Sequence, residues 1–259
     1  MSDDAATEID ASRAPLLEHL LELRRRLLYC IAAVAVTFGL CLYFSEAIFA
    51  FLLQPLKAAG QSTVIYTQIF AAFFVQVKVA FFAAMMLSFP VIANQLWQFV
   101  APGLYRKERR ALLPFLFATP LLFLAGAALA YFVAVPLALH YLLGFQGNIG
   151  GVRREAMPEV GGYLSFIMQF LFGFGAAFLL PVLLMLLERA GIVTRKGLIG
   201  ARRYAIVGAT AIAAVLTPPD LMSQVLLAVP LIVLYEAAII GIWFTERSRA
   251  RETLGVADS

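Results

Sequence analysis

Apolar runs that are too long for the core of a small soluble protein dominate this chain of 259 residues. Hydrophobic residues make up 62% of the chain and charged residues only 14%. The apolar residues gather in runs of about 18 residues or more, which is close to the length that a helix needs to cross the hydrocarbon core of a bilayer. The sequence therefore predicts an all-α integral membrane protein.

Six membrane-spanning helices are predicted from these runs. They fall at residues 27–44, 69–93, 111–136, 163–187, 204–216 and 221–243. We expect the fifth and sixth spans to be short and joined by a tight turn, TPPD at 217–220. The fifth would rise only about 20 Å across a hydrocarbon core of about 30 Å. It would therefore need a thinned bilayer or the support of neighbouring helices.

Prolines and span lengths predict irregularities in these helices. Pro90, Pro120, Pro181 and Pro230 lie inside predicted spans, where proline kinks a helix. The third apolar run extends past Pro136 to residue 145. We therefore expect it to tilt or to continue as a helix beyond the bilayer.

Lysine and arginine are divided unevenly between the two sides of this arrangement. Sixteen of the 20 basic residues lie before the first span, between spans two and three, between spans four and five, or after span six. The opposite side has Lys57, Arg153 and Arg154, and Lys78 is close enough to extend toward it. Because basic residues concentrate in cytoplasmic loops, both termini are expected in the cytoplasm.

Three regions follow from this topology. They are a cytoplasmic segment with an amphipathic helix at 1–26, one six-helix transmembrane domain at 27–244, and a disordered cytoplasmic tail at 245–259. The leader and the first apolar run are both too long for a cleavable signal peptide, so span one is expected to be permanent. The net charge of +4 belongs to the flanks of membrane helices, which argues against nucleic acid as a partner.

Motifs of catalysis and metal binding are missing from the sequence. There is no GxxxxGK[ST] loop, no GxSxG elbow and no HExxH site. The two histidines, His19 and His140, fall near opposite faces of the membrane. We therefore expect neither an enzyme nor a bound metal or cofactor.

Two glutamates stand alone among bases on the predicted cytoplasmic side. Glu22 lies in HLLELRRRL (19–27), and Glu108 lies in the loop after the second span. Nearby cations favour an ionised carboxylate, and a carboxylate accepts the paired donors of arginine in a way that lysine cannot match. The two acids could therefore bind a short cationic peptide. Alternatively, Glu22 only pairs with Arg26 at i, i+4, an interaction worth about 0.3–0.5 kcal/mol.

In these stretches the chain resembles the TatC family, the multi-span subunit of the twin-arginine protein translocase. The matching segments are HLLELRRRL (19–27), LSFPVIANQLWQFVAPGLYRKERR (87–110), AYFVAVPLA (130–138), YLSFIMQFLFGFG (163–175) and LTPPDLMSQVLLAVPLIVLYE (216–236). The resemblance implies a receptor for folded proteins with twin-arginine signal peptides, in the bacterial inner membrane. It also implies single-span partners of the TatA and TatB type, an oligomeric complex, and export driven by the proton gradient.

The resemblance also implies two binding sites. The residues of the signal-peptide site are Glu22, Glu108, His19, Arg24, Phe99, Tyr105 and Arg110. Those of the partner-helix site are Thr217, Gln224, Asp220 and Ala209. Ala209 also belongs to a stripe with Ala205 and Ala213 that would let another backbone approach closely. Packing inside the protein explains that stripe equally well.

The chain departs from the family in the fourth span. Leu179 stands where relatives commonly carry an acidic or amide residue shortly before the proline of the span. Gln169 is about 15 Å away along the helix axis and is not an obvious substitute. The sequence therefore does not support a mechanism that needs a polar group at this depth.

Two other functions stay open. A small-molecule permease would need several polar residues near the middle of the membrane, and Glu236 is the main charge inside a span. A membrane scaffold without substrate recognition would leave Glu22 and Glu108 replaceable.

Overall fold

The structure is a computed structural model that describes residues 3–61, 63–100, 113–217 and 220–255. Helices form almost all of this part of the chain. The elements are α1 (Asp3–Tyr43), α2 (Ser45–Ala58), α3 (Ala71–Val100), α4 (Leu113–Leu129), the π-helical turn η3 (Ala130–Ala134), α5 (Val135–Leu143), β1 (Gly147–Ile149), β2 (Val152–Arg154), α6 (Val160–Ala177), α7 (Leu180–Arg189), α8 (Arg195–Gly200), α9 (Arg202–Leu216) and α10 (Leu221–Gly255).

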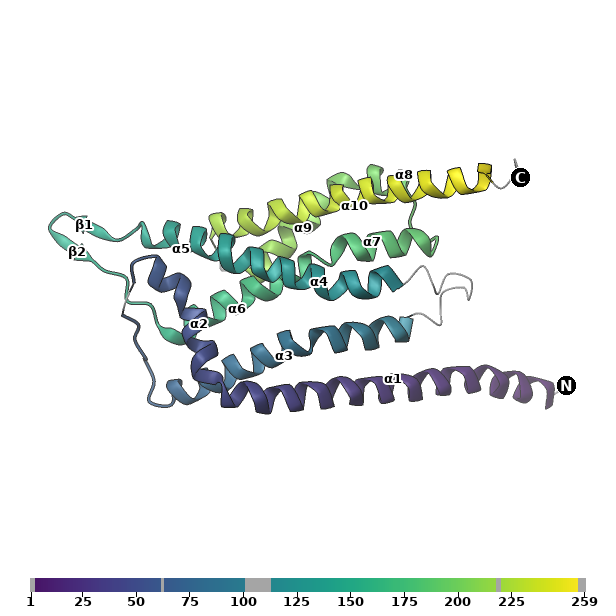
Figure 1. Cartoon of the computed structure of the whole chain (residues 1–259), viewed down its shortest axis with the longest axis horizontal. Coiled ribbons are helices and arrows are strands. Elements are labelled where there is room, and N and C mark those ends of the chain that lie inside the picture. Colours follow the sequence, from purple (N-terminus) through teal and green to yellow (C-terminus); the bar gives the residue numbers. More distant parts are fainter. Residues whose placement is uncertain (1–2, 62, 101–112, 218–219, 256–259) are drawn as a thin grey trace.

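The long helices run roughly along one axis and form an elongated bundle (Figure 1). α1 packs on α3, α4 on α6, and α10 on both α7 and α9. The N-terminus and the C-terminus lie at the same end of the bundle, where α3 ends and α4 begins (Figure 1). The opposite end carries α2, α5 and the β1–β2 hairpin (Figure 1).

Five helical stretches in the described part of the chain are long and apolar enough to cross a membrane. They are Leu20–Tyr43, Ala71–Phe99, Leu116–Leu143, Val160–Arg189 and Leu221–Arg247. They correspond to predicted spans one, two, three, four and six, so the prediction of an all-helical membrane protein is confirmed. The predicted fifth span is α9, a helix of 15 residues, which rises about 22 Å.

The helix of the sixth span continues beyond the apolar stretch, which ends at Arg247. The sequence predicts a short span followed by a disordered tail, but α10 has 35 residues and continues to Gly255. The residues between Trp243 and Gly255 include no glycine or proline, so nothing in this stretch breaks the helix. The charges after Trp243 end the apolar run and not the helix.

Prolines shape two of the spans. In the fourth, α6 ends at Ala177 and α7 begins at Leu180, because Pro181 has no N–H and its ring would collide with the carbonyl of Ala177. The helix is thus interrupted at this proline, whereas Pro90, Pro120 and Pro230 lie inside the continuous helices α3, α4 and α10. In the third, the helix passes Pro136 and ends at Leu143, as the sequence predicts, with the turn η3 just before the proline.

Close contact between α4 and α6 depends on two glycines. A Cβ atom at Gly126 would lie 2.5 Å from the carbonyl oxygen of Phe174. A Cβ atom at Gly175 would lie 2.7 Å from the ring of Phe123, which is almost completely buried. Small residues at helix contacts allow backbones to approach in this way, so these glycines set the distance between the third and fourth spans.

Neither α2 nor the β1–β2 hairpin is among the elements predicted from the sequence. α2 contains Pro55, which cannot donate to the carbonyl of Phe51 four residues earlier. The hydroxyl of Tyr131 donates to that carbonyl at 2.7 Å, and the hydroxyl of Tyr163 donates to the next one, Leu52, at 2.7 Å. Two tyrosines, from the third and fourth spans, thus hold α2 by hydrogen bonds at the end of the bundle that also carries the hairpin.

Candidate functional site

The first span is held against the second by polar contacts inside the bundle. The hydroxyl oxygens of Thr37 on α1 and Ser88 on α3 lie 2.6 Å apart in a hydrogen bond, and Ser88 is buried. Farther along α3, the indole N–H of Trp97 donates to Thr119 of α4 at 2.9 Å. The first bond holds α1 against α3, on which α1 packs, and the second holds the last turns of α3 against α4.

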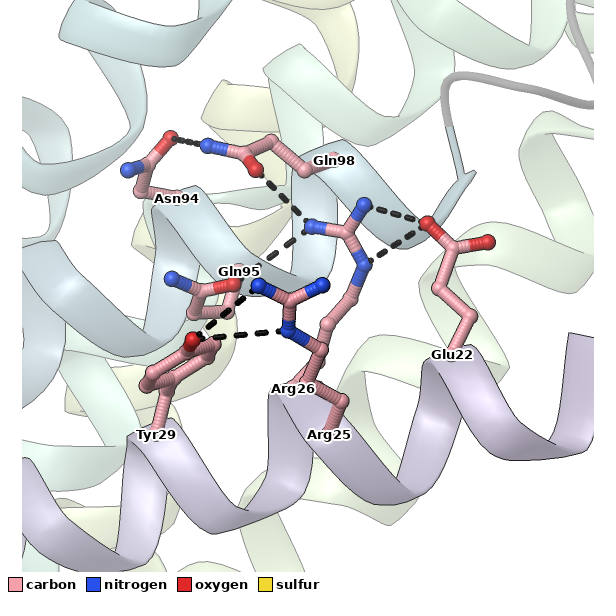
Figure 2. Close-up of polar contacts among 7 residues, drawn as sticks. All are labelled: Glu22, Arg25, Arg26, Tyr29, Asn94, Gln95 and Gln98. Carbon is pink, nitrogen blue, oxygen red and sulfur yellow. Dashed lines mark hydrogen bonds and ion pairs between the residues drawn. The ribbon is translucent and has the colours of Figure 1, made fainter.

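Glu22 and Arg26 form an ion pair one turn apart on α1 (Figure 2). Nε of Arg26 donates to Oε1 of Glu22 at 3.1 Å, and Nη2 donates to the same oxygen. The arginine side chain is 18% exposed and the glutamate 34% exposed. Arg26 is therefore the more buried member of the pair, and Glu22 is only partly exposed.

The other end of Arg26 reaches α3 (Figure 2). Its Nη1 donates to Oε1 of Gln98 at 2.9 Å and lies 3.4 Å from Oε1 of Gln95. Nε2 of Gln98 in turn donates to Oδ1 of Asn94 at 3.0 Å. We call these three side chains, Asn94, Gln95 and Gln98, the α3 amide cluster. One guanidinium thus joins the Glu22 carboxylate to the second span.

Arg25 points elsewhere although it is the neighbour of Arg26. Its guanidinium lies 5.7 Å from the ring centre of Tyr29 and within 3.3–3.4 Å of the tyrosine hydroxyl. Arg24 is exposed. Of the three consecutive arginines, only Arg26 contacts Glu22 among the residues that the structure describes.

Only some of the predicted signal-peptide residues lie in the part of the chain that the structure describes. Glu22 and Arg24 lie on α1, as does the backbone of His19, and Phe99 is half-buried near the end of α3. Three further residues of the prediction, Glu108, Tyr105 and Arg110, lie outside the described residues. The α3 amide cluster was not anticipated, although amides at 94 and 98 stand at i, i+4 on one helix face.

Three of the four predicted partner-helix residues, Thr217, Asp220 and Gln224, lie where α9 ends and α10 begins. The Thr217 hydroxyl donates to the carbonyl of Ala213 at 2.8 Å, and Nε2 of Gln224 donates to the carbonyl of Thr210 at 3.3 Å. Oδ1 of Asp220 accepts the N–H of Ser223 at 2.8 Å. Oδ2 of Asp220 is buried and has no hydrogen-bond partner within the described residues.

The alanine stripe packs inside the chain. Ala209 is 8% exposed and Ala213 is fully buried, and both belong to the main hydrophobic core. The internal-packing alternative therefore describes these alanines, and the polar residues of the turn are left as the candidate contacts.

The fourth span has its own polar contacts. Leu179 is half-buried between α6 and α7, and Gln169 is exposed on α6.

Nζ of Lys78 donates to the hydroxyl of Ser165 at 2.8 Å. This hydroxyl in turn donates to the carbonyl of Gly161. Lys78 therefore fastens α3 to α6 through Ser165.

Comparison with known proteins settles the family. A family model described as Sec-independent protein translocase protein (TatC) matches residues 18–230. The chain belongs to the TatC family. The resemblance carried by the five sequence segments is thereby confirmed, and the chain is a subunit of a protein translocase rather than an enzyme.

Several TatC relatives are similar over nearly their whole length. The Sec-independent protein translocase protein TatC of Magnetococcus marinus is 48% identical over 242 residues, 93% of this chain and 88% of the relative. The protein of that name from Escherichia coli strain K12 is 42% identical over 233 residues, 89% of this chain and 88% of the relative. A crystal structure of a TatC described as a twin arginine translocase receptor matches with a TM-score of 0.75 at 37% identity, over 86% of this chain and 96% of that one.

Proposed function

We propose that the chain is the signal-peptide receptor and scaffold of a twin-arginine translocase. Its cargo would be folded proteins whose signal peptides carry two adjacent arginines, exported under the proton gradient of the bacterial inner membrane. Membership of the TatC family supports this proposal. The structural observation that carries it is the partly exposed carboxylate of Glu22, held near the start of the first span by Arg26.

The chemistry of the site suits a guanidinium. A carboxylate accepts charge-assisted hydrogen bonds from arginine, and arginine presents its donors in a planar fork that lysine lacks. We assign Glu22 and Glu108 as the two acceptors. The neighbours that would shape the site are His19, Arg24, Phe99, Tyr105 and Arg110. Phe99 follows Gln98 on α3, so it lies at the same end of the bundle as Glu22.

We also propose six spans with both termini in the cytoplasm. Five crossings would leave the termini on opposite sides, whereas Figure 1 shows them at the same end of the bundle. α9 supplies the remaining crossing, and its 15 residues require support from α6 and α10, on which it packs. The sequence assigns sixteen of the 20 bases to the side of the two termini, which supports a cytoplasmic location for that side.

The turn between α9 and α10 is our proposed contact for single-span partners of the TatA or TatB type. Gln224 and Asp220 are half-buried there, and Oδ2 of Asp220 has no donor within the described residues. Polar side chains of this kind hydrogen-bond between membrane helices.

Glu236, the acid inside the sixth span, is occupied by Arg202, whose Nη2 donates to Oε2 at 2.7 Å. This pairing removes the main polar group that a permease would offer to a solute.

Binding of signal peptides to the purified protein in nanodiscs tests the receptor function. The native chain should bind a twin-arginine peptide more tightly than the same peptide with two lysines. Glu22→Gln or Glu108→Gln keeps the side-chain shape and removes the charge, so each should weaken twin-arginine binding about tenfold. Glu46→Gln is the matched control, because Glu46 is exposed on α2 at the opposite end.

Equal binding of both peptides by the native chain would contradict the proposal. So would a loss in the Glu46→Gln control as large as that in the two site variants, because the effect would then follow from net charge alone.

A further inference from the structure

We propose that Arg26 is a positioning residue for signal recognition, and this inference rests on the receptor function proposed above. Arg26 holds Glu22 through a single carboxylate oxygen and is itself anchored to the α3 amide cluster. The second oxygen, Oε2, accepts no hydrogen bond from the described residues, and we assign it as the acceptor for an arginine of the signal peptide.

Both hydrogen bonds from Arg26 to Glu22 end on the same carboxylate oxygen. Nε and Nη2 of Arg26 both donate to Oε1, which fills the two lone pairs of that oxygen. No hydrogen bond to Oε2 comes from any residue that the structure describes. An arriving guanidinium would therefore meet Oε2, whereas the sequence predicts that the carboxylate as a whole accepts the paired donors of an arginine.

Arg26 is also held by the second span, through Gln98. Its third donor, Nη1, is held 2.9 Å from Gln98, and Gln98 is held by Asn94. The guanidinium is thus fixed at both ends, between a carboxylate on α1 and an amide on α3 (Figure 2). Only 18% of the arginine side chain is exposed, although Gln98, its partner on α3, is exposed. Glu22 consequently has lost much of its side-chain freedom before the peptide arrives, which lowers the entropic cost of binding.

The planar guanidinium of Arg26 suits a position between two acceptors. Arginine directs five N–H donors along fixed directions in one plane, whereas lysine directs three from a single nitrogen at the end of a flexible chain. A lysine at position 26 would keep the charge but could not hold Glu22 and Gln98 along opposite edges of one group. Arg26→Lys therefore separates the geometry of this residue from its charge.

Peptide binding to the full-length protein in nanodiscs tests the inference. The variants are Arg26→Lys, Gln98→Leu and the double variant, each measured with a twin-arginine and a twin-lysine peptide. We expect Arg26→Lys to weaken twin-arginine binding about tenfold and Gln98→Leu about threefold, with little change for the twin-lysine peptide. The double variant should equal Arg26→Lys, because both changes break one link. Arg25→Lys is the control, since Arg25 contacts Tyr29 instead, and its binding should match the native protein.

Three outcomes would overturn the inference. Equal losses for both peptides would mean that Arg26 only supports the structure. Tighter twin-arginine binding by Arg26→Lys would mean that Arg26 competes with the peptide for Glu22. Additive losses in the double variant would mean that Gln98 and Arg26 act separately.

The same experiment distinguishes this inference from the receptor function. If Glu22→Gln weakens twin-arginine binding and Arg26→Lys does not, the receptor function stands and the positioning role fails. If the native chain shows no preference for the twin-arginine peptide, the receptor function itself fails.

Discussion

The hydroxyl of Tyr131 donates a hydrogen bond of 2.7 Å to the carbonyl oxygen of Phe51, and the two rings stack with their centres 4.4 Å apart. This carbonyl is the one that Pro55 leaves without a donor inside α2. A tyrosine of the third span therefore completes the hydrogen bonding of a helix that lies across the end of the bundle.

Removing this hydroxyl should destabilise the protein. Tyr131→Phe keeps the stacked ring but leaves the Phe51 carbonyl unpaired, which should cost about 1–3 kcal/mol of unfolding free energy. Denaturant unfolding in detergent measures the loss. Tyr141→Phe is the matched control, because Tyr141 is 41% exposed and its ring packs on Phe145. Equal losses in the two variants would show that the bond to Phe51 contributes nothing.

The contact between α4 and α6 predicts that Gly126 tolerates no side chain. In Gly126→Ala the new methyl group would lie 2.5 Å from a backbone oxygen, and relief of this clash by backbone movement should cost about 1–3 kcal/mol. Gly39→Ala is the control, since a methyl group at this position of α1 would meet no side chain or neighbouring helix within 4 Å. Thermal unfolding of both variants in detergent compares them, and similar midpoints would contradict a close contact.

Cysteine labelling in intact cells checks the topology. In a background with Cys30 and Cys41 replaced, single cysteines at Lys107 and Arg251 should react only with reagents that reach the cytoplasm. A cysteine at Asn148, on β1, should react with an impermeant reagent added outside. Labelling of positions 107 and 148 from the same side would rule out the proposed arrangement.

The proposed partner contact predicts a selective effect at Gln224. Gln224→Leu removes the polar group at the turn between α9 and α10, so crosslinking to a single-span partner should fall about threefold to tenfold. Binding of a twin-arginine peptide should not change, because Glu22 lies at the other end of the bundle. Met222→Leu, two residues away on α10, is the control. Loss of peptide binding with partner crosslinks intact would reverse the two assignments.

Much of the bundle could be predicted from the sequence because length and apolarity alone decide a membrane span. The elements that were not predicted, α2 and the β1–β2 hairpin, contain no long apolar run. α2 has only 14 residues, with Glu46 and Lys57 near its ends and Pro55 inside, and its position depends on hydroxyls from distant helices. The end of α10 was missed for a different reason, since charges limit the apolar run without breaking a helix.

The candidate site shows the same division between local and distant contacts. The pairing of Glu22 with Arg26 follows from their i, i+4 spacing on a helix. The contact of Arg26 with Gln98 joins residues 72 positions apart, and it exists only because α1 packs on α3. A single sequence contains no periodicity that reports such a contact.

The packing of Gly175 against the ring of Phe123 has a consequence for the evolution of the family. A larger residue at position 175 would need the space that the ring now fills, so it should be tolerated only with a smaller residue at position 123. The two positions should therefore change together among homologues, and an alignment of relatives should show them as correlated substitutions between the third and fourth spans.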